Sequence, residues 1–202
     1  MENLTPALIS KIEQLGKKQA VAFVLLLCER MSPALRAFSE ETGFPDDEYQ
    51  SCMRMGWTFL LDENVDREFE LASQRCLALA PDTEDFSSEL TTAALNATLS
   101  IGGLMEFITD ADAEHVLEAA SLCFDTIYIY VQQSSDAAGG YGSSDEDAKI
   151  RSHPLFKKEV ERQWEDIELV AQPISGTTAE WVSQLKAKAR QSDPIIPLAR
   201  RS

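Results

Sequence analysis

The sequence predicts an all-α protein, a single compact bundle of about eight or nine helices with no sheet. Apolar residues recur at steps of three and four along most of the chain, which is the period of a helix with one buried face. Residues 126–131 alone resemble a strand, and a lone strand would have no partner. There is no repeat of fixed period and no alternation of strands with helices. We therefore expect one helical domain over residues 1–202.

Start and stop signals divide the first half of the sequence into five helices. Thr5 and Pro6 open the first, because threonine caps a helix N-terminus and proline fits the first turn. The pair Ser32-Pro33 repeats this signal, so we expect the second helix to end before it and a short third helix to begin there. Gly43 suits the end of that third helix. The five helices are expected at about residues 5–16, 17–31, 33–43, 45–61 and 65–80.

Two long helices open the second half of the chain, and Gly102 and Gly103 lie inside the first of them. Each glycine weakens a helix by about 1 kcal/mol relative to alanine. We therefore expect the pair to have a role in packing, which is to permit a close helix crossing. Residues 134–147 (SSDAAGGYGSSDED) are expected to form a flexible acidic loop. Residues 193–202 are expected to form a C-terminal tail. The helices of this half are expected at about residues 85–108, 110–131, 153–171 and 178–190.

The charge of the chain is strongly negative and unevenly distributed. The sequence has 34 acidic and 18 basic residues, a net charge of −16. Residues 41–150 hold 23 of the acidic and four of the basic residues, whereas both flanking parts are nearly neutral. Such a surface repels phosphates, which argues against nucleic acid and anionic membranes as partners. The negative surface charge favours solubility. The alternative interpretation is that it binds a cation or a basic protein.

The sequence also indicates a cellular compartment. The first ten residues lack the basic start and the small-residue cleavage site of a signal peptide. The longest wholly apolar run is Ala20–Cys28, whereas a membrane span needs roughly 20 residues. We therefore expect a cytoplasmic protein. The cysteines lie far apart, with no Cys-x-x-Cys pair, and are expected to be reduced, partly buried thiols. They are Cys28, Cys52, Cys76 and Cys123.

No motif in the sequence predicts a specific chemistry. A Gly-rich phosphate loop, Gly-x-Ser-x-Gly and His-Glu-x-x-His are all absent. Asp112-x-x-His115 is the nearest approach to the paired Glu-x-x-His motifs of a di-iron bundle. It occurs once, at a helix start, where Asp112 is better explained as a cap. We therefore assign no catalytic residue, no cofactor and no metal, and the sequence leaves open whether the protein is an enzyme.

A cluster of charged residues at the end of the most apolar helix is the candidate site. Glu29 and Arg30 adjoin this helix, and buried charges need partners. Our interpretation is an ion-pair clamp, in which Glu29 pairs with Arg36 and Arg30 with the acidic residues that follow. The alternatives are a polar pocket for a small charged ligand, and metal ligation by Glu29 with other carboxylates. The acidic residues considered are Glu40, Glu41, Asp46 and Asp47; the candidate cluster is Glu29, Arg30, Arg36, Asp46 and Asp47.

The tail carries three large aliphatic residues, Ile195, Ile196 and Leu198, in a proline-containing segment that cannot continue a helix. We expect them to dock on the chain's own surface or on a second subunit. Together with the missing catalytic motifs, this favours a non-enzymatic protein that acts by protein–protein contact, with a homodimer or a basic protein as partner. The alternative is a ligand- or metal-binding protein, or an enzyme, that uses the candidate cluster.

One segment also carries a resemblance. Leu27-Cys28-Glu29-Arg30-Met31-x-Pro33, followed by Phe38 and Thr42-Gly43-Phe44-x-Asp46, resembles the YjaG-like family of bacterial proteins of unknown function. The resemblance implies a compact, all-helical, cytoplasmic bacterial protein, and it supplies no catalytic residues. Residues 137–147 look longer than the family pattern. Further matches are Arg54, Trp57, Asp85-Phe86, Pro154 through Glu159, Gln163 and Leu185.

Overall fold

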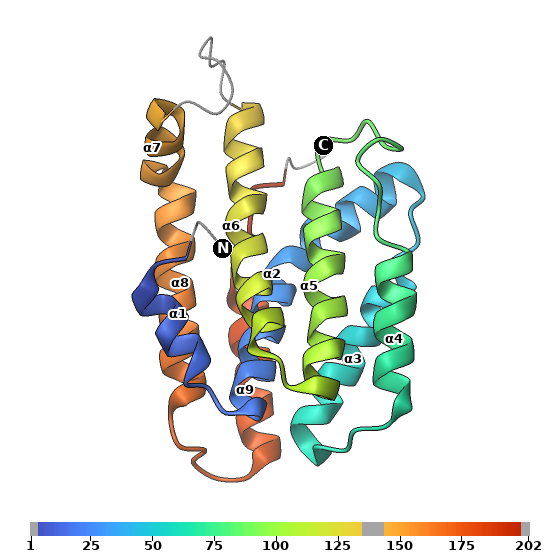
Figure 1. Cartoon of the computed structure of the whole chain (residues 1–202), viewed down its shortest axis with the longest axis vertical. Helices are drawn as coiled ribbons and strands as arrows, with labels where there is room; N and C mark the ends of the chain where they lie inside the picture. The colour runs from blue at the N-terminus through green and yellow to red at the C-terminus, as the bar shows by residue number, and fades with distance from the viewer. Residues whose placement is uncertain (1–3, 135–143, 199–202) are drawn as a thin grey trace.

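Helices make up most of the computed structural model, which describes residues 4–134 and 144–198 (Figure 1). Within these residues there are nine helices and no strand, so the predicted all-α class is confirmed. Residues 126–131, the strand-like segment, are helical. The helices are α1 (Pro6–Glu13), α2 (Lys17–Thr42), α3 (Asp47–Asp62), α4 (Arg67–Ala78), α5 (Thr91–Asp110), α6 (Ala113–Ser134), α7 (Ser144–Ser152), α8 (Pro154–Ala171) and α9 (Thr178–Gln191).

The turn predicted at Ser32-Pro33 is wrong, because α2 continues through Pro33 to Thr42. A proline inside a helix removes one hydrogen bond and costs about 3 kcal/mol. Packing outweighs this cost, since buried side chains lie on both sides of the proline: Met31 before it and Leu35 after it are 0% exposed. Gly43 does end the helix, with a φ of 78°. Tertiary burial has therefore overridden a local start signal.

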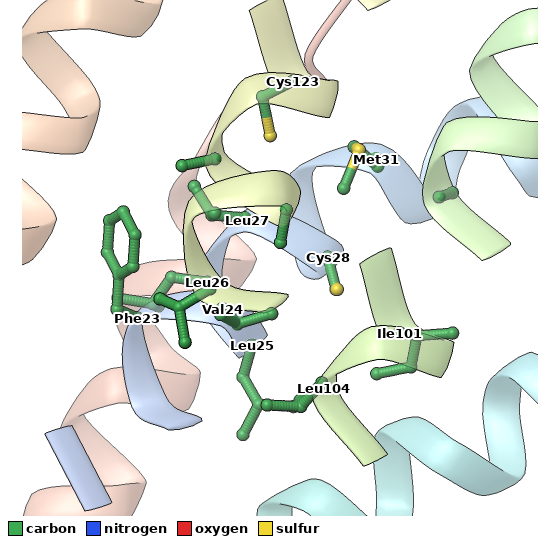
Figure 2. Close-up of a cluster of buried hydrophobic side chains, with 14 of the residues drawn as sticks. Phe23, Val24, Leu25, Leu26, Leu27, Cys28, Met31, Ile101, Leu104 and Cys123 are labelled. Atoms are coloured by element: carbon green, nitrogen blue, oxygen red, sulfur yellow. The ribbon is translucent and has the colours of Figure 1, made fainter. Parts of the chain in front are cut away.

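The core is built around the first half of α2, which is apolar on every side as predicted. Val21–Cys28 are all at most 1% exposed, and α2 contacts α3, α5, α6, α8 and α9. In Figure 2 the side chains of Leu25 and Cys28 lie toward α5, near Leu104, whereas Phe23 points away from it. Other helices thus enclose α2, and none of its faces in this segment meets water.

The close helix crossing predicted for the glycine pair is found at one of the two residues. A Cβ atom built on Gly102 would lie 2.5 Å from Leu77 Cδ2 of α4. A Cβ atom on Gly103 would meet nothing nearer than His115 of α6, at 3.9 Å, which is ordinary contact. Gly102 therefore lets α4 and α5 approach, and Gly103 has room for a methyl group.

Both ends of the expected loop 134–147 are helical. Ser134 is the last residue of α6, and residues 144–147 form the first turn of α7, while residues 135–143 lie outside the described residues. The described helices include none that is both long and apolar enough to cross a membrane. All four cysteines are free and buried, which agrees with the prediction of thiols rather than disulfides.

Residues 193–198, the described part of the tail, lie against the chain's own helices. Ile195 and Ile196 are each 1% exposed and belong to the hydrophobic core. Asp193 holds the start of the tail against α8, because its Oδ2 accepts a hydrogen bond from Lys158 Nζ at 2.6 Å. This bond and the nearby positive charges hold the pKa of Asp193 below its usual value. Of the two docking modes that were expected, the structure shows the intramolecular one.

The two glycines of α5 make a matched pair for mutation. We expect Gly103→Ala to raise the free energy of unfolding by up to about 1 kcal/mol, because alanine is the better helix former and has room. Gly102→Ala should lower it by about 1 kcal/mol, because overpacking costs about 1–3 kcal/mol and exceeds the helical gain. Urea denaturation followed by circular dichroism measures both. Equal effects from the two substitutions would contradict the close crossing at Gly102.

Candidate functional site

Arg30 forms a buried ion-pair cluster with α8. Its Nη2 donates to Glu159 Oε1 at 2.9 Å, and its Nη1 donates to Asp166 Oδ2. The three side chains are at most 2% exposed. Burial alone would lower the pKa of Arg30, but the carboxylates of Glu159 and Asp166 raise it, so the guanidinium stays charged. Arg30 is therefore held by a buried ion-pair cluster, but its partners lie 129 and 136 residues away in the sequence. The predicted clamp, with Arg30 bound to Glu40, Glu41, Asp46 or Asp47, is wrong.

Polar groups from three further positions surround this cluster. Gln163 Nε2 donates to Glu159 Oε1 at 3.3 Å and to the Ala120 carbonyl of α6 at 3.1 Å. Arg162 Nη1 lies 3.7 Å from Glu159 Oε2, and Lys188 Nζ of α9 lies 3.8 Å from Asp166 Oδ1. Arg162 and Lys188, at the edge of the cluster, offset the negative charge that the single Arg30 leaves on the two carboxylates. The cluster ties α2, α6, α8 and α9 together and is closed to solvent.

A signal for these partners was present in α8. Glu159, Gln163 and Asp166 share the buried face of the helix with Phe156 and Ile167. Apolar residues at steps of four from Phe156 would instead place Val160 and Trp164 on that face, but both are only half-buried. Charged residues at core positions need a buried counter-charge. Such residues in α8 thus pointed to a cationic partner elsewhere in the chain.

A proline inside a helix bends it, and backbone carbonyls of α2 close to Pro33 accept hydrogen bonds from other segments. Proline has no N–H, so the Glu29 carbonyl lacks its usual helical donor. The carbonyls of the residues before and after Glu29 accept bonds from other segments. Tyr49 Oη of α3 donates to the Cys28 carbonyl at 2.7 Å, and the backbone N–H of Ile195 donates to the Arg30 carbonyl at 2.9 Å. The C-terminal tail therefore docks against the α2 bend.

Glu29 points about 100° away from Arg30 around the helix axis and lies at a surface pocket. Trp57 Nε1 of α3 donates to Glu29 Oε1 at 3.0 Å, and Lys186 Nζ of α9 lies 5.2 Å from the centre of a Trp57 ring. The pocket, of about 510 Å³, is called here the α2-bend pocket. Its lining residues are Glu29, Ser32, Pro33, Arg36, Ala37, Glu40, Ala189, Arg190, Ser192 and Leu198.

The structure divides the predicted cluster into three parts. Glu29 and Arg36 line the α2-bend pocket, while Arg30 lies in the closed cluster with α8. Asp46 accepts a hydrogen bond from Gln50 at the start of α3, and Asp47 is in the first turn of that helix. Neither aspartate lines the pocket. In the described part of the chain, no three His, Cys, Asp or Glu side chains are grouped to hold a metal ion.

The pocket was not fully predicted from the sequence, because α9 and the tail supply one of its walls. Arg190 and Leu198 come from these segments, more than 150 residues after Glu29, and no local pattern linked them to α2. Arg36 and Arg190 are exposed, and among the described residues neither forms an ion pair. The pocket thus presents two carboxylates, of which Trp57 positions that of Glu29, and two guanidinium groups that are open to a ligand.

A family model described as "Protein of unknown function (DUF416)" matches residues 7–194. The chain belongs to this family. It is 23% identical over 184 residues to the uncharacterised protein YjaG of Escherichia coli K12, covering 90% of each chain. An uncharacterised Haemophilus influenzae protein is 22% identical over 195 residues, 90% of this chain and 96% of the relative. The resemblance to the YjaG-like proteins is therefore confirmed.

A solved structure supports the fold of this DUF416 chain. The crystal structure of a DUF416 family protein from Shewanella baltica OS155 matches it with a TM-score of 0.79. The match covers 91% of this chain and 93% of the other, at 23% sequence identity. At that identity, the likeness establishes the shared helical architecture.

Five of the residues that carry the family resemblance meet at the α2 bend of this DUF416 protein. Glu29 binds Trp57, and Arg30 binds Glu159, which is joined in turn by Gln163. These residues come from three helices that are widely separated in the sequence. The segment around Cys28–Pro33 is thus the point where α2, α3, α8 and the tail are joined.

Removing the cation from the buried cluster should be strongly destabilising. Arg30→Met leaves Glu159 and Asp166 buried without their partner, and we expect the free energy of unfolding to fall by about 3–5 kcal/mol. Arg36→Met, at an exposed position of the same helix, is the control and should change it by less than about 0.5 kcal/mol. Urea denaturation followed by tryptophan fluorescence measures both.

A triple variant tests the cause of that loss. Arg30→Met combined with Glu159→Met and Asp166→Leu removes every charge of the pair cluster, and it should recover most of the stability. If the triple variant is no more stable than Arg30→Met alone, uncompensated buried charge is not the reason for the loss.

Proposed function

We propose that the protein binds a small zwitterion in the α2-bend pocket and acts without a catalytic step. The observation that carries the proposal is the placement of Glu29, Arg36 and Arg190 around one cavity. A volume of about 510 Å³ falls within the usual range for small-molecule sites, about 300–1,000 Å³. Neither histidine nor cysteine lines the pocket, which supports binding rather than catalysis.

The carboxylate of Glu29 is suited to hold an ammonium group. Its Oε1 is positioned by Trp57, so little side-chain entropy remains to be lost on binding. The Glu29 carbonyl, which Pro33 deprives of a helical donor, is a second acceptor beside the pocket. A ligand with a positively charged N–H donor would satisfy both groups.

The arginines are suited to hold the other end of the ligand. A guanidinium group binds a carboxylate through two parallel hydrogen bonds, and Arg36 and Arg190 have no competing ion pair among the described residues. Glu29 and Arg36 are seven residues apart on α2, a rise of about 10.5 Å. We therefore expect a ligand whose ammonium and carboxylate groups are several bonds apart, such as an ω-amino acid or a dipeptide.

Protein–protein contact is the second candidate function. The tail cannot supply a dimer interface through Ile195 and Ile196, which are buried in the chain's own core. Exposed large apolar side chains occur instead around the α3–α4 junction, where Leu61 is 49% and Val65 41% exposed. A homodimer or a basic protein partner stays a prediction. A cytoplasmic location also remains part of the proposal, and the four free cysteines support it.

Matched ligands test the zwitterion site. We expect 5-aminovalerate to bind, as measured by chemical-shift changes in NMR spectra, and pentylamine and valerate to bind at least tenfold more weakly because each lacks one charge. Glu29→Gln keeps an acceptor for Trp57 and removes the charge, so it should weaken the binding of 5-aminovalerate about tenfold or more. Arg190→Gln should weaken it by a similar factor. Arg54→Gln, on the exposed side of α3, is the control. Equal binding of all three compounds would sink the proposal.

The dimer is tested by sedimentation velocity at micromolar concentration. If the α3–α4 junction forms the interface, we expect the double variant Leu61→Glu/Val65→Glu to convert a dimer to a monomer, because charge is poorly tolerated in an apolar interface. The variant Ile174→Glu, at an exposed apolar site beyond α8, is the control. A monomeric wild-type protein would rule out the homodimer.

A further inference from the structure

A second cavity, of about 390 Å³, adjoins the α2-bend pocket. Ala37 of α2 and Leu198 of the tail line both cavities, so the two meet at these residues. The second one is called here the Tyr130 cavity. Besides the two shared residues, its wall includes Ser87 of the α4–α5 loop, Leu90 at the N-cap of α5 and Tyr130 of α6.

The Tyr130 cavity offers an apolar surface to a ligand. Leu90, Tyr130 and Leu198 pack against the core but are only half-buried, so part of each side chain faces the cavity. A tyrosine ring favours contact with another ring or with an aliphatic group. The volume of about 390 Å³ lies within the usual range for small-molecule sites, about 300–1,000 Å³.

The charge at the rim argues for a neutral occupant. Glu89 lines the cavity and is exposed, and it forms no ion pair among the described residues. Its carboxylate repels an anionic group. An ion pair at an exposed position contributes little, because water screens it, so the carboxylate gives a cationic group only a small advantage. Apolar contact with the walls therefore decides which group binds.

The carboxylate end of the proposed zwitterion lies next to this cavity. Arg36 directly precedes Ala37 in α2, and Arg190 and Leu198 belong to the wall that α9 and the tail supply. A substituent on the carbon atom that bears the ligand's carboxylate would therefore begin beside the junction of the two cavities. Ala37 contributes only a methyl group there.

We propose that the ligand is a dipeptide whose C-terminal residue has an apolar side chain, and that this side chain enters the Tyr130 cavity past Leu198. The inference rests on the proposed function, because Arg36 and Arg190 must hold the terminal carboxylate. A dipeptide has as many bonds between its ammonium and carboxylate groups as 5-aminovalerate, so it can reach Glu29 equally well. The added side chain buries apolar surface against Tyr130. An unbranched ω-amino acid has no such group and leaves the second cavity unused.

Three dipeptides and 5-aminovalerate test this assignment by NMR titration of the full chain. We expect Gly-Phe to bind about tenfold or more tightly than Gly-Gly, because its phenyl group is removed from water. Gly-Phe should also shift the signals of Leu90 and Tyr130, which Gly-Gly leaves unchanged. Equal affinities of Gly-Phe and Gly-Gly, with both bound, would overturn the inference while the zwitterion site stands. Gly-Lys that binds as tightly as Gly-Phe would contradict the apolar side chain. Failure of all four compounds to bind would instead refute the α2-bend site itself.

Two variants and a matched control locate the side chain. Tyr130→Ala should weaken the binding of Gly-Phe about fivefold or more and leave that of Gly-Gly unchanged. Leu90→Ala should weaken the binding of Gly-Phe about threefold or more, again without an effect on Gly-Gly. Tyr128→Ala is the control, because Tyr128 is also a half-buried tyrosine of α6 but lines neither cavity. Equal losses from Tyr130→Ala and Tyr128→Ala, or equal losses for the two dipeptides, would overturn the assignment to the Tyr130 cavity.

Discussion

The charge of Arg30 is the constraint on which the rest of the structure depends. Its guanidinium lies in the interior, where an unpaired charge would be too costly. Glu159 and Asp166 neutralise it from one face of α8, so the height and rotation of α8 against α2 are set by directed hydrogen bonds. Burial, together with the nearby Glu159, also raises the pKa of the Cys123 thiol well above its usual value, which keeps that group uncharged beside the cluster.

Two neighbouring residues of α2 have opposite surroundings because successive residues of a helix point about 100° apart. Arg30 turns inward to a cluster that is sealed, whereas Glu29 turns outward to Trp57 and the α2-bend pocket. Pro33 adds a third property, since it frees a carbonyl next to that pocket. A short segment therefore combines a structural anchor with an open polar surface, and the two can be altered independently.

Much of the fold follows from the sequence, because period and composition are local properties. The apolar run of α2, the glycine end at Gly43 and the all-α class were predicted from such patterns. Pro33 misled the prediction, since burial of Met31 and Leu35 decides the path of the chain there. Neither the partners of Arg30 nor the wall supplied by Arg190 follows from sequence position, because both depend on how distant helices pack.

The bond from the Ile195 N–H to the Arg30 carbonyl has a consequence for biosynthesis. A ribosome adds roughly 5–20 residues per second, so Arg30 is made roughly 10–30 s before Ile195. During that time the most apolar helix of the protein has neither its α8 counter-charges nor the tail that covers its bend. The nascent chain therefore needs protection from aggregation until translation ends. Its central helix is synthesised early and enclosed last.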